Sequence, residues 1–150
     1  MLAKILLSAF ALTAGVAFSV QSGINAGLAR QLGSSLIAAT ISFSVGTIAL
    51  TTIGLATGQL VIGSGSLKSV PVWMWLSGGL LGACIVYSSV LLVPRLGVAA
   101  VAALIIAGQL IAAAVMDHYG LLGAPVHELT VLRMTGLLLL IMGAVLVRFT

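Results

Sequence analysis

The sequence predicts an all-α integral membrane protein, folded as a bundle of five transmembrane helices. Hydrophobic residues make up 61% of the chain and charged residues only 5%, whereas an ordinary soluble domain carries about a quarter charged residues. The 150 residues also divide into five long apolar runs with short glycine, proline or charged segments between them. Because about 20 apolar residues cross a membrane as a helix, each run is long enough to be one span. The runs are continuously apolar and do not alternate, so a β-barrel is excluded.

The first two spans are predicted at residues 2–29 and 34–57. Ser34 follows Gly33 and has the chemistry of a helix N-cap, and Gly58 ends the second span. Residues 58–70 contain alternating Gly and Ser and therefore predict a loop.

The remaining spans are predicted at residues 71–93, 97–116 and 130–147. Pro71 suits the first turn of a helix, and Pro94 with Arg95 is expected to break the third span. The polar residues 117–120 are expected to open a loop that leads to the fifth span. All 150 residues are then accounted for by a single transmembrane domain.

A few polar side chains lie inside these spans and are candidates to bind a solute. Gln21 and Asn25 share one face of the first span. Because an unpartnered amide in hydrocarbon costs several kcal/mol, each must either bond a neighbouring helix or face a wet cavity, and both alternatives stay open. Gln109 lies near the middle of the fourth span, and Tyr87 adds a hydroxyl to the third. We predict that Asn25 and Gln109 face a shared polar cavity.

Asp117 and His118 are candidates for coupling or gating. Asp117 lies eight residues after Gln109 and therefore on the same helix face. The two residues form a line of polar groups that leads toward one membrane boundary. At that boundary a carboxylate stays charged at small cost. We therefore expect that Asp117 is not an obligatory proton site, and it could instead mark the end of the helix or contact His118.

Other classes of function have little support in the sequence. His118, His127 and Glu128 lack the spacing of metal ligands, and Cys84 is the single cysteine. The sequence contains no recognisable catalytic triad and no phosphate-binding loop, so we expect neither an enzyme nor a cofactor. The six Lys and Arg residues are scattered, which argues against nucleic-acid binding.

Several segments together resemble a known family. They are residues 21–28 (QSGINAGL), 41–47 (ISFSVGT), Trp75 with Gly78, Gly79 and Gly82, residues 93–97 (VPRLG), and residues 108–110 (GQL) followed by 117–120 (DHYG). Their order and spacing resemble the half-size, five-span branch of the drug/metabolite transporter superfamily, the YdcZ-like inner-membrane proteins of bacteria. The resemblance covers almost the whole chain.

The resemblance implies a multi-pass protein of the bacterial inner membrane and an exporter whose substrate it does not identify. It further implies one half of a ten-span transporter with two inverted repeats, so that a single copy needs a partner. The chain departs from four-span relatives, which carry a Glu in their first helix, since neither Asp nor Glu occurs in the first three spans. This departure puts cation binding by a buried carboxylate in doubt.

The leading hypothesis is a secondary transporter that moves a small polar or amphipathic solute by alternating access. Its partner is expected to be a second, antiparallel copy, because neither side of the membrane has an excess of cations. A parallel dimer, a fixed orientation set by other features, and a paired homologue that supplies the opposite half stay open as alternatives. One side carries Lys4, Lys68 and Arg133, and the other carries Arg30, Arg95 and Arg148. The alternative is a non-transporting assembly or regulatory subunit, in which the buried amides only join helices.

Overall fold

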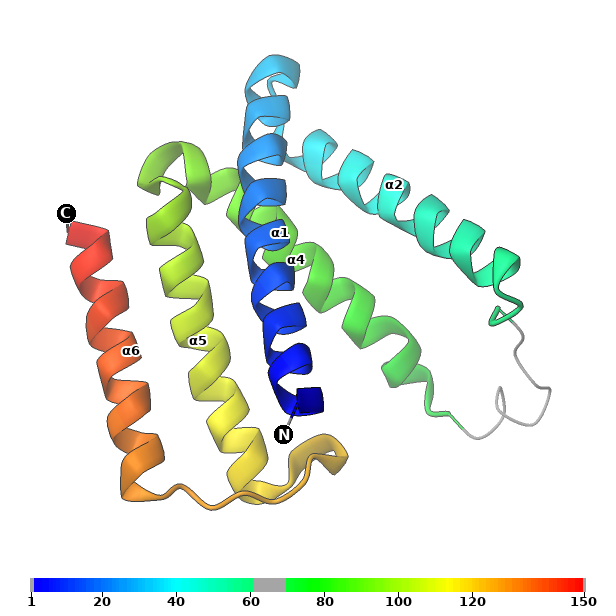
Figure 1. The fold of residues 1–150 in the computed structure, drawn as a ribbon. Helices are drawn as coiled ribbons and strands as arrows, with labels where there is room; N and C mark the ends of the chain where they lie inside the picture. The colour runs from blue at the N-terminus through cyan, green and yellow to red at the C-terminus, as the bar shows by residue number, and fades with distance from the viewer. Residues whose placement is uncertain (1, 61–69, 150) are drawn as a thin grey trace. The chain divides into compact units, whose positions relative to one another are not determined.

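The computed structural model describes residues 2–60 and 70–149, which fold into α-helices with one short 3-10 turn. The long helices are α1 (Leu2–Leu32), α2 (Ser35–Ala56), α4 (Val72–Leu96), α5 (Val98–Tyr119) and α6 (Val131–Phe149) (Figure 1). Each of the five is long and apolar enough to cross a membrane. The all-α, five-span fold is therefore confirmed over the described residues.

The chain divides into two compact units, residues 1–94 and 95–150. The first holds α1, α2 and nearly all of α4, and the second holds α5, the turn η1 (Leu121–Gly123) and α6. That these units form a single domain stays a prediction. The core of the first unit is a cluster of small side chains from three helices, Ala29, Ala38 and Val90. Small residues allow helix backbones to approach closely, which drives packing inside a membrane.

The connection between α1 and α2 is a tight turn. α1 continues to Leu32, three residues beyond the predicted end, and Gly33 then adopts a φ of +69° that terminates it. The side chain of Ser34 accepts a hydrogen bond from the Ile37 amide at 3.3 Å, which confirms the predicted N-cap. The loop predicted after Gly58 falls mainly on residues 61–69, outside the described residues.

Pro94 does not break α4, contrary to the sequence prediction. It lies inside the helix, which continues to Leu96. Proline has a φ that fits a helix and removes only one intrahelical hydrogen bond, so the last turn tolerates it. Gly97 ends the helix instead, because its φ of +82° lies in a region that other residues rarely adopt.

The predicted loop at residues 117–120 is also wrong for its first three positions. α5 continues through Tyr119 and ends at Gly120, which is left-handed with a φ of +61°. Left-handed glycine is a common helix terminator, so the polar character of residues 117–119 did not decide the boundary. In this second unit α5 and α6 lie side by side and run in opposite directions (Figure 1).

Candidate solute-binding groove

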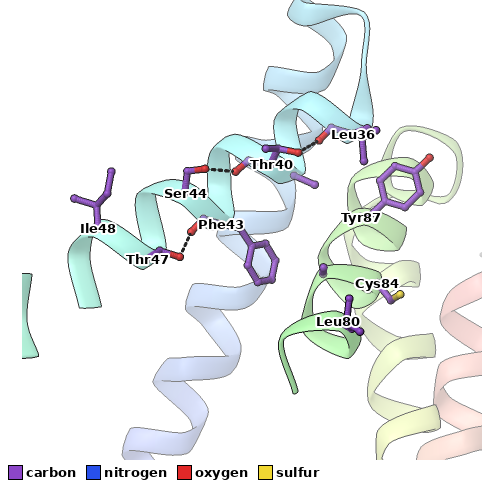
Figure 2. A pocket seen from close by; sticks show the side chains of 11 residues that line it. Leu36, Thr40, Phe43, Ser44, Thr47, Ile48, Leu80, Cys84 and Tyr87 are labelled. Atoms are coloured by element: carbon purple, nitrogen blue, oxygen red, sulfur yellow. Dashed lines mark hydrogen bonds between the residues drawn. The ribbon is translucent and has the colours of Figure 1, made fainter. Parts of the chain in front are cut away.

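An open groove of ≈ 720 Å³ lies between α2 and α4 within the first unit (Figure 2). This volume falls in the range of about 300–1,000 Å³ that is typical of small-molecule sites. The α2 wall consists of Leu36, Ala39, Thr40, Phe43, Ser44, Thr47 and Ile48, and the α4 wall consists of Leu80, Ala83, Cys84 and Tyr87. The groove therefore combines an apolar surface with several hydroxyl groups.

Three of these hydroxyls form a row along one face of α2. The hydroxyls of Thr40, Ser44 and Thr47 donate to the backbone carbonyls of Leu36, Thr40 and Phe43 at 2.9, 2.9 and 2.8 Å (Figure 2). Each bond joins residues four apart, which is how a helix satisfies Ser and Thr in an apolar setting. The protons of the three hydroxyls are thus engaged, while the three residues are exposed and line the groove.

Aromatic side chains and a thiol complete the groove. The ring of Phe43 points from α2 toward α4 and lies against Gly82, with its Cζ atom 3.5 Å from where a β-carbon on Gly82 would lie (Figure 2). Tyr87, predicted to bind solute, is 38% exposed and lines the α4 wall. Cys84 is the single cysteine and is also exposed in this wall. The thiol therefore offers a chemical probe of the groove.

Gln21 and Asn25 meet at one acceptor on the neighbouring helix. The Gln21 Nε2 atom donates to Ser42 Oγ at 3.1 Å, and the Asn25 Nδ2 atom donates to the same oxygen at 3.0 Å. Asn25 is only 6% exposed, whereas Gln21 is exposed. Both amides thus join α1 to α2. Neither residue lines the α2–α4 groove, and their predicted contact with solute stays a prediction.

The second unit holds Gln109 and the two candidates for coupling or gating. Gln109 is exposed on α5, and the cavity that it is predicted to share with Asn25 stays a prediction. Asp117 forms an ion pair with Arg133, whose Nη2 atom lies 3.0 Å from Asp117 Oδ2. Asp117 and Arg133 also line a cavity of ≈ 270 Å³ between α5 and α6. The carboxylate therefore reaches across to the start of α6.

His118 lies beside this ion pair in sequence but has a different environment. Its ring meets that of Tyr119 edge to face, with centroids 4.8 Å apart. Its Nδ1 atom is buried and has no hydrogen-bond partner among the described residues. Across residues 2–60 and 70–149, no three His, Cys, Asp or Glu side chains are grouped so that they could hold a metal ion.

Three features of these sites were missed from the sequence. The hydroxyls of residues 40, 44 and 47 follow a spacing of i, i+4 and i+7, which would have placed them on one helix face. Ser42 carries no signal of its own, since only the fold shows that two amides reach it. Asp117 lies at the end of the fourth span and Arg133 at the start of the fifth. Their opposite charges at adjoining span ends could have predicted the ion pair.

Five helices that are long and apolar enough to cross a membrane define a polytopic membrane protein, and a groove of small-molecule size lies between two of them. Residues 6–146 match the model of the family described as "Putative inner membrane exporter, YdcZ". The chain belongs to this YdcZ family and is an inner-membrane protein. It is 32% identical over 139 residues to the Inner membrane protein YdcZ of Escherichia coli (strain K12), covering 93% of this chain and 92% of the relative. No solved structure shows a significant match.

Proposed function

We propose that the chain is a secondary exporter that works by alternating access. The observation that carries the proposal is the groove of ≈ 720 Å³ between α2 and α4, in a member of an exporter family. A groove that lies between two membrane-spanning helices can hold a solute at membrane depth. Secondary transporters commonly bind there and expose the site to each side in turn.

The transported solute is proposed to be small and polar or amphipathic. Apolar side chains in the groove suit a hydrocarbon body, and the hydroxyl groups of its exposed Ser and Thr residues suit a polar group. Tyr87 is the predicted solute ligand that lines this groove. Gln21, Asn25 and Gln109 are proposed as further solute contacts, since the amide carbonyl of each can accept a hydrogen bond.

The functional unit is proposed to be an antiparallel homodimer. Ten-span transporters with inverted repeats hold two opposed halves in one polypeptide, and two opposed copies of a five-span chain would reproduce that arrangement. The balanced distribution of Lys and Arg supports the proposal, because orientation normally follows an excess of these residues on the cytoplasmic side.

A non-transporting assembly subunit is the second candidate. The bonds from Gln21 and Asn25 to Ser42 favour it, because these amides join helices in the structure. In that role the groove would have no need to open to both sides of the membrane. Access to the groove therefore separates the two candidates.

The experiment uses Cys84, the single native cysteine, in proteoliposomes. A membrane-impermeant maleimide is added to the outside only, and the labelled fraction is followed with time. Alternating access predicts that Cys84 is labelled to completion, because every groove opens outward in turn. A control with Cys84→Ala and Leu2→Cys places the thiol near the N-terminus, outside the groove, and should reach a plateau equal to the outward-facing fraction.

Two results would contradict the exporter. A Cys84 plateau equal to that of the Leu2→Cys control would indicate a groove fixed toward one side. An unreactive Cys84 would indicate a thiol that faces lipid throughout, because maleimide reacts with the thiolate, which hydrocarbon disfavours.

A further inference from the structure

We infer that the groove selects an uncharged, largely apolar solute that carries a hydrogen-bond donor. The inference rests on the proposed function and specifies the solute class for the α2–α4 groove. It is carried by the hydroxyl row of Thr40, Ser44 and Thr47, together with the uncharged lining around it.

The hydroxyl row offers acceptors and no free donors. A hydroxyl has one proton and two lone pairs. The protons of Thr40, Ser44 and Thr47 already bond backbone carbonyls at 2.9, 2.9 and 2.8 Å (Figure 2). A hydroxyl that donates becomes a better acceptor, because each hydrogen bond in a chain polarises the next. The oxygens are therefore prepared to receive an N–H or O–H group from a solute.

The spacing of the row gives such a solute successive positions along the helix. Residues 40, 44 and 47 lie on one face of α2 and span roughly 10 Å at 1.5 Å per residue. All three side chains are exposed in the groove, as is the ring of Phe43 between them. A donor group can therefore bond one of three oxygens on the same wall of the groove as the Phe43 ring.

Charged solutes are disfavoured by the same lining. Neither Asp nor Glu occurs in residues 1–94, and none of the described residues that line the groove is charged. A bare ion in such a site would lose hydration without gaining a counter-ion, which costs far more than one hydrogen bond returns. The remaining means of holding a cation is the face of Phe43 or Tyr87, which tetramethylammonium probes directly.

The test compares two probes that differ in one hydrogen-bond donor. Indole has an N–H donor, and 1-methylindole has a methyl group in its place. Each is titrated against maleimide labelling of Cys84 in the full chain, held in lipid nanodiscs. We expect indole to give half-maximal protection at an about three- to tenfold lower concentration than 1-methylindole, as one neutral hydrogen bond provides.

Matched variants assign that difference to the hydroxyl row. The triple variant Thr40→Val, Ser44→Ala and Thr47→Val removes all three acceptors of the row and should bring the two probes to equal protection. Thr47→Ser keeps the hydroxyl and should preserve the difference. Thr52→Val is the control, since Thr52 makes the same bond to its own helix, at 2.8 Å to the Ile48 carbonyl, but does not line the groove.

Each contrary result has a defined meaning. Equal protection of the native chain by both indoles would overturn the donor requirement, and stronger protection by tetramethylammonium would overturn the uncharged class. Protection by none of the probes would overturn the inference as a whole. Completion of one-sided Cys84 labelling in proteoliposomes reports separately on the exporter, so the two failures are distinguishable.

Discussion

The guanidinium of Arg133 and the carboxylate of Asp117 join the beginning of α6 to the end of α5, with Nη2 3.0 Å from Oδ2. The same guanidinium donates through Nη1 to the His127 carbonyl at 3.2 Å, while the His127 amide donates to the Asp117 carbonyl at 2.9 Å. These bonds hold the connecting loop against both helices. Asp117 is therefore part of a structural junction at the end of its span.

A double-mutant cycle measures the contribution of this ion pair. Asp117→Asn, Arg133→Gln and the double variant are compared by the free energy of unfolding in detergent. The two side chains are 30% and 42% exposed, so we expect a coupling energy of about 0.2–1 kcal/mol that weakens as salt is added. Strictly additive losses would show that the two charges do not interact.

Ser42→Ala tests the junction between α1 and α2. The change removes the oxygen that receives both the Gln21 and Asn25 amides, and Asn25 is buried. We expect the free energy of unfolding to fall by about 1–2 kcal/mol. This is the upper part of the range known for hydrogen bonds between membrane helices, and it applies here because two amides lose one acceptor. Thr52→Val is the matched control, because its hydroxyl bonds only its own helix. A loss no larger than in this control would contradict the shared-acceptor role.

Gly120→Ala tests the termination of α5. The φ of +61° costs a residue with a β-carbon about 1–2 kcal/mol. That β-carbon would also lie 2.8 Å from Val126 Cγ2. We expect lower stability than in Gly143→Ala, where the added carbon meets nothing within 4 Å. Val126→Ala in the Gly120→Ala background should restore only the part due to the steric contact. Equal stability of Gly120→Ala and Gly143→Ala would disprove this explanation.

The sequence was sufficient to predict the helices because span formation depends on local composition. Each predicted span corresponds to one observed helix, and the Ser34 cap was identified from its chemistry. The errors at Pro94 and Tyr119 share one cause. Both boundaries were assigned from proline or polar side chains, whereas the chain ends these helices at glycines 97 and 120, whose φ angles are positive.

The sites were harder to predict because they depend on pairs of helices. Tyr87 was recognised from its hydroxyl, but its position in a groove depends on the α2 wall opposite. Gln21 and Asn25 were recognised as needing partners, and the structure supplies the Ser42 oxygen for both. Composition says that a buried amide must be satisfied, but only the packing of α1 on α2 identifies the acceptor.

A pair of C-terminal reporters tests whether two oppositely oriented copies form the exporter. Alkaline phosphatase is active only on the outer side of the inner membrane. Green fluorescent protein is fluorescent only on the inner side, because it does not become fluorescent after export by the general secretory route. Each reporter is fused after Thr150, and its signal is normalised to the amount of fusion protein. Three cations on each side predict that both fusions are active. One added Lys, at Gly65 or in place of Leu96, should shift the population in opposite directions. Activity of only one reporter for nearly all molecules, unchanged by either Lys, would contradict the antiparallel homodimer.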